Sequence, residues 1–187
     1  ESELDGIDRL SVCLYRLGLS LTALLLLCRG AGVLGWLVPL SPSQWLTMLV
    51  VASGLCGFCL HLYDKRVRFL LQGLAWGGLM LAACGAPAIL VLGAALATCG
   101  APAILVLGAA LATLCGLAFK EQFCFAIPGI RLLPLLLPLL WLLEWIRVAW
   151  AAALVALASG LLLGLLSLAK WRMPLHFDIG DRGRYQL

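Results

Sequence analysis

The stretch HLYDKRVR, residues 61–68, separates two long apolar segments and decides how the chain lies in a membrane. It is the densest group of charged residues between two apolar runs. Cytoplasmic loops carry the excess of Lys and Arg in membrane proteins, so Lys65, Arg66 and Arg68 are predicted to lie in the cytoplasm. The side of every other loop then follows from the number of spans.

The composition predicts an all-α membrane protein. Of the 187 residues, 64% are hydrophobic and 12% are charged, whereas soluble domains are roughly 45–50% apolar and about 25% charged. One span needs about 20 apolar residues. We therefore predict that residues 1–187 form a single polytopic helical bundle. The net charge of +4 does not indicate a nucleic-acid partner, because the basic residues flank apolar spans as orientation signals do.

Six spans are predicted, and the distribution of charge supports that number. They cover about residues 10–27, 44–62, 69–83, 102–119, 132–143 and 148–168, and a polar tail follows at 173–187. With six spans, eleven of the 13 Lys and Arg residues fall on one side, and only Arg29 and Arg147 fall on the other. This asymmetry predicts that both termini are cytoplasmic.

Polar residues and prolines give the expected span boundaries. Ser41 followed by Pro42 is typical of a helix start. Arg29 with Gly30 is expected to close the first span, and Lys120 with Glu121 to stop the fourth.

Three further side chains or pairs carry local expectations. Arg16 is expected to snorkel to the membrane surface, the alternative being a buried partner for an acidic group. Pro134 and Pro138 predict a kinked helix, tolerable only where neighbours satisfy the freed carbonyl groups. Glu144 and Arg147 would face each other and pair if their helix continued.

A fifteen-residue sequence occurs twice in tandem. CGAPAILVLGAALAT fills residues 84–98 and again 99–113. A recent duplication and an error in the sequence are the two explanations. The fourth span is placed in the second copy, and the segment 84–98 is interpreted as an apolar extension on the non-cytoplasmic side.

The candidate functional residues lie on the predicted cytoplasmic face. His61, His176 and Glu121 are candidate ligands for a pigment or a haem, and chlorophyll, carotenoid or lipid are the cofactors considered. The predicted docking face consists of Asp64, Lys65, Arg66, Arg68, Lys120, Asp178, Asp181 and Arg182. Small residues at four-residue spacing predict close helix packing at Gly73, Gly77, Gly160 and Gly164. The alternative to a functional face is that the loops carrying these charged and histidine residues are polar only because they meet water.

The sequence gives little indication of an enzyme. Cys56 and Cys59, followed by His61, form a weak metal motif without a second thiol pair. No phosphate loop, nucleophile elbow or zinc-protease helix is present. We therefore expect no catalytic residues and no metal site.

Three segments resemble one known family. At His61–Lys65, Lys120–Phe125 and His176–Arg182 the chain resembles an uncharacterised family of integral membrane proteins found mainly in cyanobacteria, domain of unknown function 2301. The resemblance covers nearly the whole chain and implies a photosynthetic host, with a thylakoid or plasma membrane. The duplicated fifteen residues depart from the family pattern.

Two functions follow as hypotheses. The first is a non-enzymatic accessory subunit or assembly factor of a photosynthetic membrane complex, in contact with the lipid bilayer and with a partner such as a photosystem. The second is a small-molecule carrier or membrane enzyme with its site on the cytoplasmic face.

Overall fold

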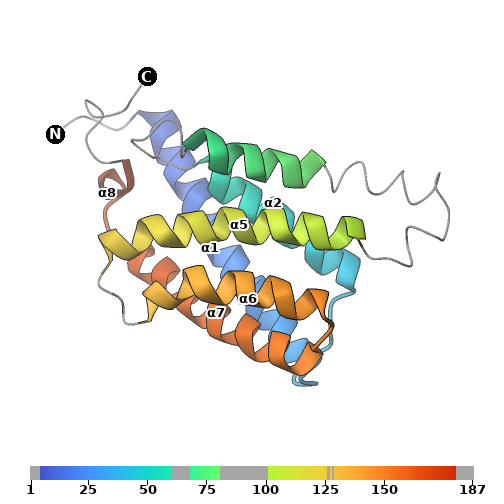
Figure 1. Ribbon diagram of the computed structural model, residues 1–187. Helices are drawn as coiled ribbons and strands as arrows, with labels where there is room; N and C mark the ends of the chain where they lie inside the picture. The colour runs from blue at the N-terminus through green and yellow to red at the C-terminus, as the bar shows by residue number, and fades with distance from the viewer. Residues whose placement is uncertain (1–4, 60–67, 81–100, 126, 128, 180–187) are drawn as a thin grey trace.

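The computed structural model describes residues 5–59, 68–80, 101–125, 127 and 129–179. Within these ranges the chain is helical and contains no strand, as the composition predicted (Figure 1). Residues 68–80 are helical, and the other elements are α1 (Gly6–Val33), α2 (Pro42–Phe58), α5 (Ala101–Cys124), η1 (Ile130–Leu132), α6 (Leu133–Trp145), α7 (Ala149–Trp171) and α8 (His176–Ile179).

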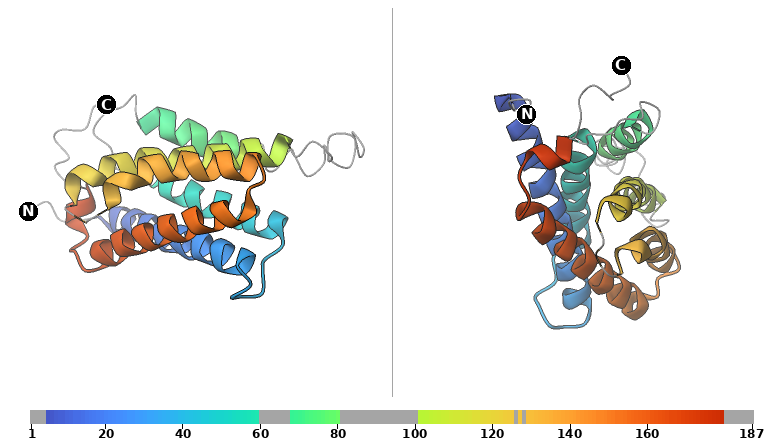
Figure 2. Two further views of the ribbon diagram at one scale, coloured as in Figure 1. Left: turned by 60° about the horizontal axis from the view of Figure 1, so that its bottom comes forward. Right: turned by 90° about the vertical axis from the view of Figure 1, so that its left-hand side faces the viewer.

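Successive long helices run in opposite directions along one bundle (Figures 1 and 2). Helix α1 packs most extensively against α7 and then α2, while α5 packs against α6 and α2. One end of the bundle, called the α8 end below, contains the start of α1, the ends of α5 and α7, and α8. The other, called the pocket end, contains the end of α1, the start of α2 and the turn from α6 to α7.

Each of the six predicted spans corresponds to a helix. Three of these helices are long and apolar enough to cross a membrane, namely Gly6–Val33, Ala103–Cys124 and Ala149–Trp171. Helices α2 and α6, with 17 and 13 residues, are shorter than the roughly 20 residues of a standard span. The number of six spans and the cytoplasmic termini remain predictions.

Two predicted helix ends are wrong. Arg29 and Gly30 lie inside α1, and Lys120 and Glu121 lie inside α5. The reason is the same in both places: the charged side chain is paired within the bundle, so the helix does not have to end where charge appears.

The predicted helix start at Ser41 is confirmed, and the carbonyl group that Pro138 frees has a partner, whereas the predicted kink of α6 stays a prediction. The Ser41 side chain accepts a hydrogen bond from the Gln44 amide, which makes a capping box at the start of α2 with Pro42 in the first turn. Pro138 lies inside α6 and cannot donate to the carbonyl of Pro134, four residues earlier. The Cys115 thiol donates to that carbonyl instead, at 3.6 Å, so a neighbouring helix satisfies the freed group.

Glycine lets α1 and α7 approach closely. A Cβ atom at Gly160 would lie within 3.0 Å of Leu27 and of the Ala23 carbonyl, and one at Gly30 would overlap Leu157 on α7. Gly160 therefore lies where α1 and α7 approach closely. Gly164 is not so close, because its Cβ would reach only Ala23, at 4.0 Å.

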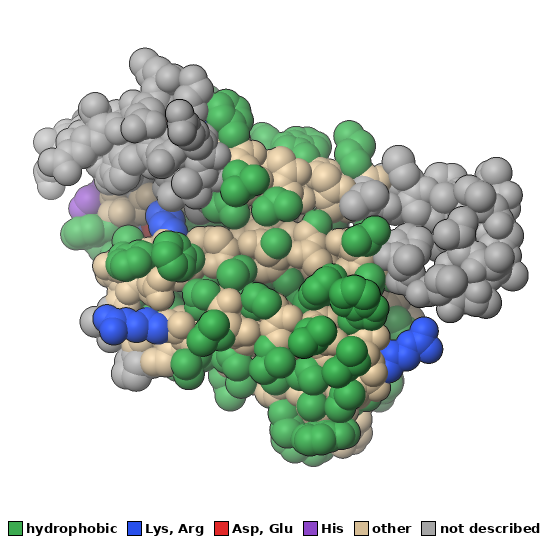
Figure 3. Space-filling view, viewed as in Figure 1, with side chains coloured by type: hydrophobic (Ala, Val, Ile, Leu, Met, Phe, Trp, Pro, Cys, Tyr) green, Lys and Arg blue, Asp and Glu red, His purple; other side chains and the backbone are tan. Residues whose placement is uncertain are grey.

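The outer surface agrees with a membrane setting. Figure 3 shows hydrophobic side chains along the helices and Lys or Arg atoms near the two ends of the bundle. Bulky side chains such as Leu135, Leu154 and Leu161 are more than half exposed. The second copy of the repeat begins α5, while residues 84–98 lie outside the described part of the chain.

Candidate functional site

At the α8 end, five polar side chains from four helices meet away from water. Tyr15 and Arg16 come from α1, Glu121 from α5, Lys170 from α7 and Asp178 from α8. Their exposed fractions are between 1% and 6%. Buried charge is costly unless it is paired and hydrogen-bonded, so the partners of each group decide what this cluster does.

The five groups form one continuous chain of contacts. Arg16 Nε donates to Asp178 Oδ2 at 2.7 Å, and Lys170 Nζ donates to Asp178 Oδ1. Lys170 Nζ also lies 3.1 Å from Glu121 Oε2, while the Tyr15 hydroxyl donates to Glu121 Oε1 at 2.7 Å. Two cations thus alternate with two carboxylates, and the chain of contacts is neutral in sum.

Arg16 also fixes the segment that joins α7 to α8. Its guanidinium group donates to the carbonyl oxygens of Met173 at 2.9 Å and Pro174 at 3.2 Å. The expectation that Arg16 snorkels to the surface is wrong, and the alternative, a buried partner for an acidic group, is correct. The cluster, called the ionic latch below, holds α8 against α1, α5 and α7.

The latch engages some of the predicted site residues. Glu121, a candidate pigment ligand, has both oxygens in contact with protein partners, and Asp178, predicted to lie on a docking face, is 6% exposed. Lys120 is 23% exposed and lies 3.7 Å from Glu121. A ligand or partner would have to displace these contacts.

Other predicted residues are apart from the latch or cannot be placed. His176 is exposed, and its ring lies beside Phe177. Arg68 lies at the start of the helical residues 68–80, against the Phe69 ring. The remaining ones, His61, Asp64, Lys65, Arg66, Asp181 and Arg182, lie outside the described residues. Their proposed roles stay predictions.

The weak thiol motif is buried instead of forming an open ligand pair. Cys56 and Cys59 are both buried, and Cys56 Sγ donates to the Tyr15 carbonyl at 3.8 Å. Over the described ranges, no three His, Cys, Asp or Glu side chains are grouped as a metal would need.

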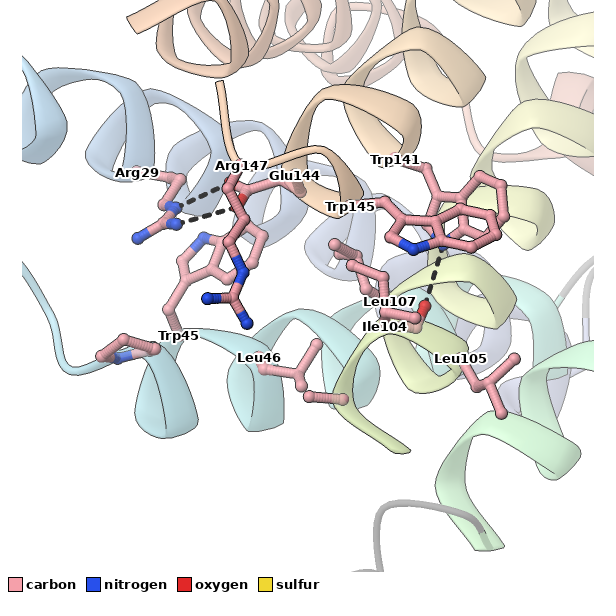
Figure 4. Close-up of a pocket in the computed structure, with 12 residues that line it drawn as sticks. Arg29, Trp45, Leu46, Ile104, Leu105, Leu107, Trp141, Glu144, Trp145 and Arg147 are labelled. Atoms are coloured by element: carbon pink, nitrogen blue, oxygen red, sulfur yellow. Dashed lines mark hydrogen bonds and ion pairs between the residues drawn. The ribbon is translucent and has the colours of Figure 1, made fainter. Parts of the chain in front are cut away.

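A cavity of about 470 Å³ opens at the pocket end (Figure 4). This is within the usual range for small-molecule sites, roughly 300–1,000 Å³. Aliphatic and indole side chains make most of its wall, and three charged groups lie among them. The lining residues are Arg29, Pro42, Trp45, Leu46, Ala103, Ile104, Leu105, Leu107, Trp141, Glu144, Trp145 and Arg147.

Two of the indoles are fixed by the backbone of neighbouring helices. Trp45 Nε1 donates to the Leu25 carbonyl at 2.9 Å, and Trp141 Nε1 donates to the Ile104 carbonyl at the same distance. Their N–H groups are satisfied, so both rings present apolar surface to the cavity. Trp145 is 57% exposed and lies at its edge.

The charged groups of the cavity differ in their pairing. Arg29 contacts Glu144 through two hydrogen bonds, of 3.1 and 3.0 Å, and lies over the Trp45 ring. The predicted pair of Glu144 with Arg147 is therefore wrong, since α6 ends at Trp145 and Glu144 turns to α1 instead. Among the residues that the structure describes, none forms an ion pair with Arg147. The cavity carries a net charge of +1.

Sequence reasoning missed this cavity, although signals for it were present. Arg29 and Arg147 were noted as the two basic residues on the side opposite the other eleven. Trp45 lies in the first turn of α2 and Trp141 and Trp145 in the last turns of α6, so antiparallel helices bring the three indoles to the same end of the bundle. Only the packing of α1, α2, α5 and α6 shows that these groups face one space.

Comparison with known proteins identifies relatives without a known activity. The model of a family described as uncharacterized integral membrane protein, DUF2301, matches residues 55–187. An uncharacterized protein of Haemophilus influenzae is 37% identical over all 187 residues, which cover 96% of its own length. No solved structure matches the chain.

Proposed function

The chain belongs to the DUF2301 family of integral membrane proteins, and from that premise we propose that it binds an amphiphilic small molecule in the cavity at the pocket end. The supporting observation is the lining of that cavity. Fixed indole and aliphatic walls suit an apolar body, while Arg29, Glu144 and Arg147 offer polar contacts to a head group. Small-molecule sites have this combination of apolar walls and few polar groups.

The position of the cavity bears on how a ligand would enter. By the charge count, the α8 end faces the cytoplasm and the cavity opens on the opposite side. This differs from the carrier or enzyme expected on the cytoplasmic face, whose candidate Glu121 is held in the ionic latch. Under this proposal the protein is a binding protein in the plasma membrane and does not have to catalyse a reaction.

The test is to fill the cavity without disturbing the core. Ala103 is exposed and lines the cavity, so Ala103→Trp would place an indole in the space. Ala149→Trp is the matched control, since Ala149 is also exposed at the start of a helix but does not line the cavity. Both variants would be purified in mild detergent, and co-purifying lipids would be counted by native mass spectrometry.

The two variants should differ clearly. Ala103→Trp should lower the retained amphiphile about tenfold, which corresponds to about 1.4 kcal/mol, and Ala149→Trp should retain as much as the unaltered protein. Equal retention by both variants would contradict binding in this cavity.

A second proposal, the accessory subunit, is favoured by an open face of the helical residues 68–80. Gly73 and Gly77 are exposed, and no described residue would lie within 4 Å of a Cβ atom on either. Small residues at this spacing accept a partner helix. Co-purification of a larger complex with the unaltered protein, lost in Gly73→Leu and kept in Gly164→Leu, would support this function.

The photosynthetic setting of that second proposal has no support from the comparisons. Haemophilus influenzae, the source of the relative that matches over the whole chain, is a non-photosynthetic bacterium. A photosystem partner, a thylakoid location and pigment ligands therefore remain expectations from the sequence. Their test is a visible absorption band in protein purified from native membranes, and loss of that band on His61→Ala.

A further inference from the structure

Arg147 occupies a backbone position that favours glycine. Its φ angle is +60°, in the left-handed region that side chains with a Cβ atom rarely adopt. The Val148 amide bonds the Leu143 carbonyl at 3.0 Å and the Arg147 amide bonds the Glu144 carbonyl at 3.3 Å. This is the Schellman arrangement that ends many helices, and its left-handed residue is usually Gly.

The turn itself therefore does not explain an arginine. A glycine would satisfy the same two hydrogen bonds without the steric cost of a Cβ atom. Residues held in unfavourable backbone conformations cluster where a site needs them.

The side chain lines the cavity and has no acidic partner there. Figure 4 shows it extending beside the Trp45 ring, away from the pair of Arg29 with Glu144. Glu144 is already engaged by two guanidinium nitrogens of Arg29. Of the two cations in the cavity, Arg147 is thus the one that no carboxylate of the described residues neutralises.

We propose that Arg147 is the head-group anchor of the cavity and selects an amphiphile with an anionic carboxylate or phosphate. This inference rests on the proposed function and deepens it. A guanidinium group binds both oxyanions through paired donors. The indole and aliphatic walls hold the apolar part, and the net charge of +1 disfavours cationic head groups. The same chemistry is offered by a free fatty acid and by an anionic phospholipid.

The experiment compares three substitutions of one residue. Arg147→Gly removes the charge and relieves the backbone, Arg147→Asn removes the charge and tolerates the left-handed conformation, and Arg147→Lys keeps a charge. Oleate and oleyl alcohol, which share a chain and differ in head-group charge, are titrated into purified protein while the tryptophan fluorescence is followed. Vesicles of phosphatidylglycerol or phosphatidylcholine provide the phospholipid arm.

The expected results separate the two proposals. The unaltered protein should bind oleate about tenfold more tightly than oleyl alcohol. Arg147→Gly and Arg147→Asn should abolish that preference, Arg147→Lys should keep part of it, and Arg147→Gly should raise the unfolding midpoint. Preference for phosphatidylglycerol alone would identify the phospholipid as the source of the anion.

Two outcomes would overturn the inference. If the unaltered protein binds oleate and oleyl alcohol equally and also binds the two kinds of vesicle equally, Arg147 has no role in selecting an anion and the cavity remains only a binding site. If no probe binds in any arm, the proposed function fails as well.

Discussion

Removing the Asp178 carboxylate tests the ionic latch most directly. Asp178 lies between Arg16 and Lys170, whose side chains are 2% and 3% exposed. In Asp178→Ala, Lys170 keeps Glu121 at 3.1 Å, but Arg16 keeps only the two backbone carbonyls that accept from it. One buried charge is then left without a counter-charge.

The expected loss follows from that imbalance. Breaking a buried ion pair by removing one partner costs about 3–5 kcal/mol. Helix α8 is short, and if it undocks water can reach Arg16, so the lower part of this range is expected. The free energy of unfolding would be measured by titrating sodium dodecyl sulfate into dodecyl maltoside micelles that contain the protein.

Glu144→Ala is the matched control. It also deletes a carboxylate that is paired with an arginine, but Glu144 and Arg29 are partly exposed, at 18% and 23%, and ion pairs that water reaches contribute about 0–1 kcal/mol. A loss below 1 kcal/mol in Asp178→Ala, or equal losses in both variants, would refute a latch that excludes water.

Three further predictions concern packing, topology and the repeat. Gly30→Ala should destabilise the protein by about 1–3 kcal/mol, because the added Cβ atom would overlap Leu157 and the Ala153 carbonyl. Gly164→Ala is the control and should be nearly neutral. Equal effects of the two substitutions would contradict the close contact of α1 with α7. A reporter fused after Leu187 should be active only in the cytoplasm, and activity on the other side would contradict the predicted cytoplasmic C-terminus. Deleting residues 84–98 should leave the unfolding free energy within about 0.5 kcal/mol, measured by the same detergent titration.

The helices could be predicted because their signals are local. Apolar runs located the helices that correspond to the six predicted spans, and Ser41 followed by Pro42 marked the start of α2. The effect of Pro138 was also foreseeable, since a proline always frees the carbonyl four residues earlier. The partner of that carbonyl could not be foreseen, because Cys115 lies on another helix.

The ionic latch and the charged groups of the cavity could not be predicted, because the side chains that pair there are distant in the sequence. Tyr15 and Glu121 are 106 residues apart, and Arg16 and Asp178 are 162 apart. Taken alone, a charge near the end of an apolar run predicts an interface, so Arg16 was assigned to the membrane surface. Pairing reverses that assignment, because a neutral cluster can be buried where a single charge cannot.

The two ends of the bundle differ in what they leave for a ligand. At the α8 end, each carboxylate of the latch contacts a buried cation, so binding there must break protein contacts. At the pocket end, the pair of Arg29 with Glu144 is accompanied by a second arginine, Arg147, for which the described chain offers no carboxylate. An anion can therefore bind at the pocket end without displacing a native ion pair, and this difference directs the search for a ligand to that end.

The expected neutrality of deleting residues 84–98 follows from what fixes the position of α5. Its first half repeats the deleted sequence, but its second half is unique and places Leu114, Leu117 and Glu121 in the buried core. Slipping α5 by one repeat would move these residues by roughly 22 Å and break the contacts of Glu121 with Tyr15 and Lys170. Because the copies are identical and adjacent, deleting either one gives the same chain, and the remaining copy supplies the same side chains to α5. A loss as large as that of Asp178→Ala would mean that the first copy contributes core contacts of its own.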